Sequence, residues 1–416
     1  MREGNAFVFL TLALCLAVPF GGIGIVALGA LYSIAASRLK LVVDATRLYF
    51  TGWLRSDAFA LNLLILAVTL LELALIYYHG DSTGEFENQL KQYVAALAVL
   101  LTIRRYPPEI ILWGAAVGCV LAGVVALHDI VVLDLPRAEG PTNAIRFGMI
   151  AVLLAMFSWI GAIFGRIPLG QRMFMACAAA SGIFAVFASG SRGAVLALPV
   201  MLLLLIPRIW RRSRRVAIAA AGLFVIFSIA LGLWQISTLR YGLSNMKTVV
   251  ESVVSGKRVS EHSTRDRVEM LRLSADLFSA HPWVGVGSTG WDKAVADQIR
   301  TSPPGVALDM PFNQPHNQYA NDLAKGGLVR ALGGLAMLLM PLWFFLKRHP
   351  FKFRRTALAP LLGVVTCVAY AMFGLTEAVM DLSLTASLYA ILVFYLIAAS
   401  EGAPLSSVPN ASARSA

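Results

Sequence analysis

Long apolar segments recur along most of this chain, and they constrain its fold more than any other feature. A helix that crosses a membrane needs roughly 20 apolar residues, and such segments follow one another from residue 6 to residue 399. The composition agrees, since 58% of the 416 residues are hydrophobic and 14% are charged, with a mean hydropathy of +0.72. Soluble domains have about a quarter charged residues. The chain is therefore predicted to be an all-α integral membrane protein that crosses the bilayer many times.

The apolar segments define about twelve predicted spans. Pro19, Gly21 and Gly22 separate the first two, and they mark either a tight hairpin or a kink in one long helix. The predicted spans are 6–20, 21–37, 57–78, 91–103, 109–127, 147–165, 171–188, 193–207, 216–234, 323–346, 357–375 and 382–399.

The spans fall into two blocks joined by one long connection. Residues 1–234 carry the first nine predicted spans and residues 315–400 carry the last three. Residues 235–314 contain no span, and residues 401–416 form a small, polar tail that is predicted to be disordered. Long segments between spans usually bind a ligand or take part in chemistry.

Basic residues are concentrated in alternate connections between the spans. With the N-terminus inside, the inner connections include "PRIWRRSRR" and "LKRHPFKFRR". Cytoplasmic loops carry an excess of Lys and Arg, so both termini are predicted to be cytoplasmic and residues 235–314 to lie outside. This pattern accounts for 35 basic against 23 acidic residues without nucleic-acid binding. The basic residues of the short outer connections are Lys91, Arg137, Arg146 and Arg192.

The long outer connection has a helical part and an irregular part. In "STRDRVEMLRLSADLFSAHP" the apolar residues recur at helical spacing, which predicts a helix. The following "PWVGVGSTGW" is predicted to form turns, and "TSPPGVALDMP" to form an irregular loop.

Arginines on the outer side are candidates for anion binding. Arg192, in "FASGSRGAVLA", lies where positive charge is disfavoured. It either reaches lipid phosphates from the membrane edge or binds an anion directly. Gly190 and Gly193 permit close approach, helix-start amides add positive potential, and guanidinium offers a planar fork of donors that suits phosphate. Arg265 and Arg267 diverge on their helix, so one is expected to face the same site and the other to be a solvated charge.

His316 lies in a polar cluster just before a predicted span, in "MPFNQPHNQYANDLAKGG". It is either a helix cap or packing residue, or a general base, because histidine titrates near neutral pH. Asn317 or Asp322 would then orient its ring. Tyr319 belongs either to this site or to the aromatic belt at the membrane interface.

Other polar residues have simpler explanations. Glu377 and Asp381 flank an outer turn and are expected to be solvated, whereas Glu72 lies almost within a span, where ionisable residues are functional candidates. His128 and Asp129 match no familiar metal-ligand spacing. The sequence has no nucleotide-binding loop, dinucleotide fingerprint, serine elbow or cysteine–histidine cluster. No cofactor and no metal are therefore predicted.

Three motifs, in order along the chain, resemble the O-antigen ligase family. They are "GSRGA" at an outer helix junction, "RVEMLRLSADLFSAHPWVGVGSTGW" in the long outer connection, and "HNQYANDLAKGGL" opening the next span. The similarity runs from about Gly190 to Gly334, and the span layout agrees over nearly the whole chain. One position departs from the pattern, because Arg330 stands where relatives commonly have a second glycine after the histidine motif.

The resemblance implies a glycosyltransferase of the bacterial inner membrane, with a type C-like fold and an active site that faces the periplasm. Its donor would be O-antigen polysaccharide on undecaprenyl pyrophosphate, and its acceptor a sugar of the lipid A–core. The reaction would be inverting and metal-independent, and the remaining partners would be membrane lipids, with no nucleic acid. By this mapping the catalytic residues are His316, Arg192 and Arg265, and the substrate-binding residues are Arg267, Asn317, Tyr319 and Ser191.

Three other functions remain open at the level of sequence. An O-antigen polymerase, or a ligase that attaches glycans to protein, would use the same donor, and only the acceptor separates these activities. A transporter of lipid-linked glycan would have related halves, broken helices and charges at the membrane midplane. The sequence has no convincing internal repeat, and its polar candidates cluster at one face. The enzyme is therefore the favoured interpretation.

The predicted orientation can be tested by cysteine labelling. Cysteines introduced within residues 235–314 should react with a membrane-impermeant thiol reagent in intact spheroplasts, because the flanking basic loops hold this segment outside. Cysteines introduced in the basic loops should be protected. The opposite labelling pattern would overturn the orientation.

Overall fold

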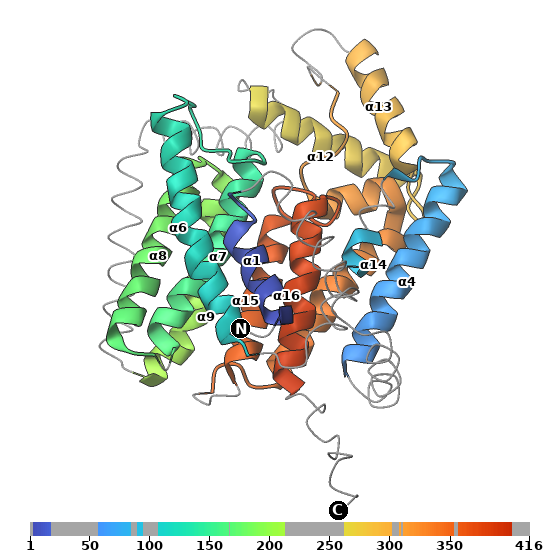
Figure 1. The fold of residues 1–416 in the computed structure, drawn as a ribbon. Helices are drawn as coiled ribbons and strands as arrows, with labels where there is room; N and C mark the ends of the chain where they lie inside the picture. Colours follow the sequence, from blue (N-terminus) through green and yellow to red (C-terminus); the bar gives the residue numbers. More distant parts are fainter. Residues whose placement is uncertain are drawn as a thin grey trace, which may run out of the picture.

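The protein is a bundle of α-helices with two further helices packed against one end (Figure 1). The computed structural model describes residues 3–17, 57–84, 90–94, 107–165, 167–212, 262–301, 308, 311–352 and 357–401. These stretches contain helices and turns but no strand, which confirms the predicted all-α class. The bundle helices are α1 (Glu3–Leu14), α4 (Asp57–His79), α6 (Glu109–Val131), α7 (Ala144–Phe164), α8 (Leu169–Ala188), α9 (Arg192–Arg212), α14 (Gln318–Lys347), α15 (Leu358–Phe373) and α16 (Ser383–Glu401).

Six of the described helices are long and apolar enough to cross a membrane, namely α6, α7, α8, α9, α14 and α16. Shorter apolar stretches lie in α4, from Leu63 to His79, and in α15. A polytopic membrane protein is consistent with these helices, whereas the total of about twelve spans stays a prediction. Predicted spans 21–37 and 216–234 lie outside the described residues, and 91–103 is described only to residue 94.

Small residues bring the helices of the bundle close together. α6 packs against α1, α7 and α8. At Gly182 of α8 an added Cβ would lie 2.7 Å from Cys119 Sγ of α6, and at Gly114 of α6 it would lie 3.0 Å from the Phe9 carbonyl of α1. Small residues are typical of helix contacts in membranes, because apolar lipid gives no hydrophobic drive and tight packing must supply the attraction.

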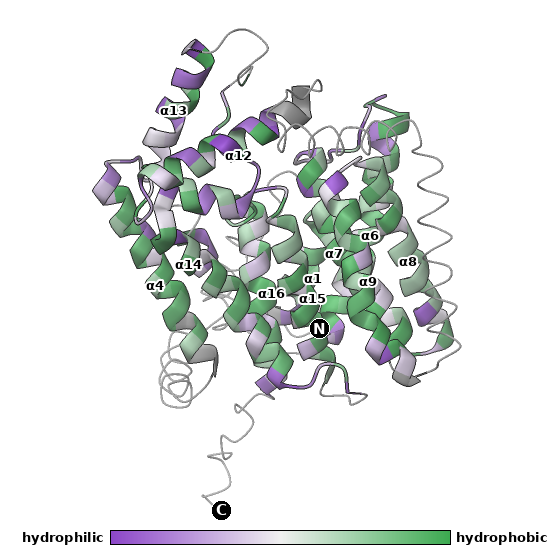
Figure 2. Ribbon diagram, turned by 180° about the vertical axis from the view of Figure 1, so that it is seen from behind, coloured by the Kyte–Doolittle hydropathy of each residue, from purple (hydrophilic) through white to green (hydrophobic). Residues whose placement is uncertain are grey.

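The two helices outside the bundle come from the long connection. α12 (His262–Ala280) confirms the helix that the apolar spacing predicted. α13 (Gly287–Thr301) shows that the turn prediction for "PWVGVGSTGW" was wrong from Gly287 onward. Hydrophilic residues are frequent on α12 and α13, whereas hydrophobic residues dominate the bundle helices (Figure 2). Both helices pack on α14, and α13 also contacts α4.

Asp81, just after α4, caps the N-terminus of α13 with its side chain. Its carboxylate accepts hydrogen bonds from the backbone N–H of Ser288 and Thr289, both at 2.8 Å. Burial alone would raise the pKa of Asp81, but the hydrogen bonds from Thr289 and Ser288 outweigh burial and lower it. His79 Nε2 lies 2.8 Å from the Val284 carbonyl. A cap from a distant turn cannot be recognised in the local sequence, which explains why α13 was missed.

A break in α14 joins the bundle to the connection. Gly327 has φ 60° and ψ −158°, so the helix is interrupted there. The N–H of Leu328 donates to the Pro282 carbonyl at 2.8 Å, and the N–H of Val329 donates to the Trp283 carbonyl at 3.2 Å. These contacts replace helical hydrogen bonds that the break removes, which a membrane-embedded backbone requires. We call this contact between residues 281–287 and the break the α14 clamp.

Glycine is required on both sides of the α14 clamp. A Cβ on Gly327 would lie within 2.6 Å of the Val284 nitrogen, and a Cβ on Gly285 (φ +64°) within 2.5 Å of the Gly326 nitrogen. Both neighbours are backbone atoms that cannot move aside. Gly285 belongs to the motif "PWVGVGSTGW" and Gly327 to the motif "HNQYANDLAKGGL". One close contact between the backbones of these two motifs therefore requires both glycines.

Substitution of Gly327 by alanine should destabilise the protein. The added methyl group meets the 283–284 backbone, and alanine is strained at this φ. Gly333→Ala, six residues further along the same helix, is a matched control, because its Cβ would have only ordinary contacts at 3.5 Å or more. The thermal midpoint of detergent-purified protein should fall for Gly327→Ala and stay level or rise for Gly333→Ala. Equal midpoints would contradict the clamp.

Candidate functional site

His316 is held at the mouth of α14 by the residues that follow it. Asn317 is the N-cap of this helix, and its Oδ1 accepts a hydrogen bond from the Ala320 N–H at 2.9 Å. The backbone of His316 has φ +50°, in the left-handed region that non-glycine residues rarely adopt. The strained turn directs the imidazole away from the helix axis, toward the loop between α15 and α16.

Glu377, in that loop, is the partner of His316. The Nδ1 of His316 lies 3.1 Å from Glu377 Oε1, and the Glu377 residue is only 1% exposed. The same oxygen accepts hydrogen bonds from Gln314 Nε2 at 2.7 Å and from the Ala378 N–H at 3.2 Å. Phe312 contacts the imidazole edge-on, with ring centroids 5.9 Å apart. The ring is therefore fixed in both position and rotation.

This arrangement leaves one ring nitrogen available for chemistry. A carboxylate that accepts from Nδ1–H selects the neutral tautomer in which Nε2 is an acceptor. Among the described residues no group hydrogen-bonds Nε2, and the His316 side chain is 25% exposed. A neutral imidazole with a buried carboxylate partner and an accessible Nε2 is suited to accept a proton.

Asn317 and Tyr319 help to build the site. Asn317 Nδ2 donates to the Leu375 carbonyl at 3.0 Å, and the Tyr319 hydroxyl donates to the Ala371 carbonyl at 2.9 Å. These bonds tie the start of α14 to the segment that carries Glu377. A direct contact of either side chain with substrate stays a prediction. The expected orienting role of Asn317 or Asp322 falls instead to Glu377.

Arg192 begins α9 next to the same loop. It is exposed, whereas the preceding Ser191 is buried and its Oγ accepts a hydrogen bond from the Ala194 N–H at 3.4 Å. Gly193 lies against Thr376, since an added Cβ would be 2.8 Å from Thr376 Cβ. Thr376 precedes Glu377, so the start of α9 borders the His316–Glu377 pair. The substrate-binding role of Ser191 stays a prediction.

Arg267 of α12 lies within electrostatic range of this pair. Burial lowers the pKa of its guanidinium, Arg192 and Arg137 lower it further, and Glu377 acts in the opposite direction. Of the two arginines expected on this helix, the structure thus brings Arg267 to the site. The side chain of Arg265 lies outside the described residues.

Sequence analysis missed Glu377 as the partner of His316 and did not connect Arg137 with Arg267. Glu377 was expected to be solvated in its turn, and this was wrong because the packed loop buries it. The available signal was a carboxylate among apolar neighbours in "FGLTEAVM". Arg137 was counted only as an outer basic residue, and no local pattern connects it with Arg267.

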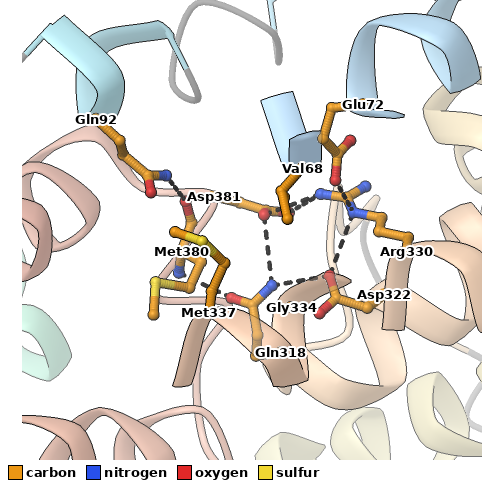
Figure 3. A pocket seen from close by; sticks show the side chains of 10 residues that line it. All are labelled: Val68, Glu72, Gln92, Gln318, Asp322, Arg330, Gly334, Met337, Met380 and Asp381. Atoms are coloured by element: carbon orange, nitrogen blue, oxygen red, sulfur yellow. Dashed lines mark hydrogen bonds and ion pairs between the residues drawn. The ribbon is translucent and has the colours of Figure 1, made fainter. Parts of the chain in front are cut away.

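A second polar cluster surrounds Arg330 and includes residues from both sides of the break in α14 (Figure 3). Arg330 Nε lies 2.9 Å from Glu72 Oε1 and 3.2 Å from Asp322 Oδ1. Its terminal nitrogen lies 2.9 Å and 3.0 Å from the two oxygens of Asp381. Gln318 donates to Asp322 at 2.9 Å. We call these residues the Arg330 cluster.

The Arg330 cluster corrects two expectations. Asp381 is not a solvated turn residue, because its carboxylate pairs with Arg330 and with Asn321 Nδ2 at 2.6 Å. Glu72 is buried within the bundle, 8% exposed, and serves as an ion-pair partner. The cluster borders a cavity of about 20 Å³, which is large enough for one water molecule. The unusual Arg330 thus joins α4, both parts of α14 and the loop before α16.

No group of three or more His, Cys, Asp or Glu is placed to hold a metal ion in the part of the chain that the structure describes. Asp129, next to His128, accepts hydrogen bonds from the N–H groups of Glu139 and Gly140 at 3.0 and 2.8 Å. It organises a turn.

The fold and the site define a helical membrane protein with a histidine–carboxylate pair and arginines at one end of its bundle. Residues 175–333 match the protein family described as O-Antigen ligase. This match confirms, over about two fifths of the chain, the resemblance that the sequence motifs predicted. The matched segment includes Arg192, Arg267 and His316, and it ends before Glu377. A Haemophilus influenzae protein described as "Uncharacterized protein" is 23% identical over 312 residues, covering 73% of this chain and 76% of that protein.

Removal of Arg330 should destabilise the protein strongly. Arg330→Met leaves Glu72, Asp322 and Asp381 without their shared counter-ion, and losing one partner of a buried ion pair costs about 3–5 kcal/mol. Arg272→Met is the control, since Arg272 forms an exposed pair with Glu269 at 2.7 Å, worth roughly 0.2–1 kcal/mol. The thermal midpoint should fall much further for Arg330→Met. Similar midpoints would show that the cluster does not stabilise the fold.

Proposed function

We propose that this protein transfers O-antigen polysaccharide from undecaprenyl pyrophosphate to a sugar of the lipid A–core, on the periplasmic face of the bacterial inner membrane. The observation that carries the proposal is the His316–Glu377 pair, 3.1 Å apart, within electrostatic range of Arg267. The family match supports a lipid-linked polysaccharide as the donor. Hydrophilic residues are frequent on α12, the helix that carries Arg267, which supports a site at the membrane surface (Figure 2).

His316 acts as the general base. The Nε2 atom accepts the proton of the acceptor hydroxyl while the hydroxyl oxygen forms a bond to the anomeric carbon of the donor. The bond from that carbon to the pyrophosphate oxygen breaks, and its electron pair leaves with the lipid pyrophosphate. Attack from the face opposite the leaving group inverts the anomeric configuration. Glu377 stabilises the imidazolium that forms, because its carboxylate stays bound to Nδ1–H.

The arginines bind the leaving group. Negative charge grows on the pyrophosphate as the glycosidic bond breaks, and fixed guanidinium groups stabilise such charge without rearranging. Arg192 at the start of α9 and Arg267 on α12 approach from two different elements. Arg265 stays a candidate for the same role.

Reconstitution with a histidine variant tests the proposal. Purified protein supplied with lipid-linked O-antigen and lipid A–core should transfer glycan without added nucleotide or metal. His316→Ala should bind the donor but transfer it about 10²–10⁴-fold more slowly. Glu377→Gln should also transfer slowly, since an amide does not stabilise imidazolium equally well.

His349 offers a matched control for that experiment. It also has a left-handed backbone, with φ +51° against +50° for His316, but it follows the opposite end of α14. Alanine in the left-handed region keeps the backbone strain in both variants alike, and His349→Ala should keep full activity. If His316→Ala transfers within a few-fold of wild type per folded molecule, His316 is not the base. Transfer to a second O-antigen unit or to protein, with lipid A–core unmodified, would instead assign a polymerase or a protein ligase.

A further inference from the structure

Gln314 precedes His316 by two residues and binds the same carboxylate oxygen. Its Nε2 donates a hydrogen bond to Glu377 Oε1 at 2.7 Å, and the Nδ1 of His316 lies 3.1 Å from that oxygen. Pro315, between the two residues, is buried. Because both side chains reach one atom, the amide and the imidazole lie close together at the mouth of α14.

The carboxylate of Glu377 fixes which way the amide of Gln314 points. An ionised carboxylate only accepts hydrogen bonds, so the amide presents its NH₂ group to Glu377 and its Oε1 away from it. Among the described residues no group hydrogen-bonds this Oε1, and it is not one of the fully buried polar atoms that lack a partner. Gln314 itself is half-buried. Its Oε1 is therefore an accessible hydrogen-bond acceptor on a side chain that is held in place.

Two different acceptor atoms thus lie beside one carboxylate. In the proposed reaction Nε2 of His316 takes a proton from a hydroxyl group. The Oε1 of Gln314 belongs to an amide, so it accepts a hydrogen bond but does not remove a proton. An uncharged amide suits an uncharged hydroxyl, whereas guanidinium suits phosphate. Gln314 is therefore fitted to the acceptor sugar and not to the pyrophosphate of the donor.

A sugar acceptor requires a second contact of this kind. Its ring carries hydroxyl groups on neighbouring carbons, and one linkage is formed only if a single hydroxyl is held against the base. His316 has one accessible nitrogen and contacts one hydroxyl, which leaves the sugar free to rotate about that contact. A hydrogen bond from the neighbouring hydroxyl to Gln314 Oε1 would fix the orientation of the ring.

We propose that Gln314 binds the hydroxyl next to the one that His316 deprotonates, and thereby selects which hydroxyl of the acceptor sugar is glycosylated. The inference rests on the proposed function and specifies the chemistry of its acceptor, a sugar with two neighbouring free hydroxyl groups. Both contacts depend on Glu377, which is 1% exposed and binds Gln314 and His316 through the same oxygen.

Acceptors that each lack one hydroxyl test the assignment. Purified protein is supplied with lipid-linked O-antigen and with lipid A–core, or with analogues in which one hydroxyl of the glycosylated sugar is replaced by hydrogen. Wild type should lose about tenfold in kcat/KM with the analogue that lacks the neighbouring hydroxyl, as expected for one hydrogen bond. Gln314→Met keeps the length of the side chain without its amide. It should show this loss with the intact acceptor and no further loss with that analogue.

Phe312→Leu is the matched control for this experiment. Phe312 also contacts His316, with ring centroids 5.9 Å apart, but its side chain has no polar atom that could bind a hydroxyl. Any loss in this variant should therefore leave the ratio between the intact acceptor and each analogue as in wild type. Linkage analysis of the product should give one position for wild type and Phe312→Leu, and more than one for Gln314→Met. Each ratio is taken within one variant, so a smaller folded fraction does not affect it.

The result with Gln314→Met decides the inference separately from the proposed function. Unchanged kcat/KM would overturn the inference, and so would the wild-type ratio of intact acceptor to every analogue, which assigns Gln314 to the support of Glu377 alone. In both cases transfer to lipid A–core by wild type leaves the proposed function standing. If wild type extends a second O-antigen unit instead, the proposed acceptor is refuted, and the same ratios measured on that sugar decide the role of Gln314. Transfer only to a protein hydroxyl, which has no neighbouring hydroxyl, would refute both.

Discussion

The α14 clamp is the constraint on which the rest of the structure depends. A break inside a membrane helix leaves backbone groups that lipid cannot satisfy. Here the carbonyls of Pro282 and Trp283 accept the N–H groups of Leu328 and Val329. The turn between α12 and α13 is therefore bound to α14 by its main chain, so Arg267 on α12 has a fixed relation to His316. A hinge at this place would let Arg267 and His316 separate.

The two polar clusters differ in exposure. Near His316, Arg192 is exposed and the imidazole side chain is 25% exposed. Around Arg330 three carboxylates surround one guanidinium, and Glu72, Asp322 and Arg330 are buried. The buried Lys325 also acts on Asp381. Burial penalises unpaired charge, so close pairing stabilises this cluster. The more accessible His316 side chain suits a ligand that arrives and leaves.

The Arg330 cluster also supports the site mechanically. Asp381 lies four residues after Glu377 in the same loop, and Gln318 lies two residues after His316. Gln318 accepts the Met380 N–H at 2.8 Å and donates to Asp322 at 2.9 Å. The loop that carries Glu377 is thus anchored on both sides of the imidazole. Arg330 is accommodated within the bundle because its guanidinium has three carboxylate partners.

The sequence by itself determined the helical membrane class and the helix α12, and it singled out His316, Arg192, Arg265 and Arg267 as candidates for one site. These follow from apolar length, helical periodicity and short motifs, which are local properties of a chain. Only the tertiary structure decided that Glu377 orients His316, that Asp81 starts α13, and that Arg330 is paired. Glu377 is 61 positions from His316, and Asp81 is 207 positions from Ser288. Partners so far apart meet because of how helices pack, and a residue's own neighbours in sequence carry no record of that contact.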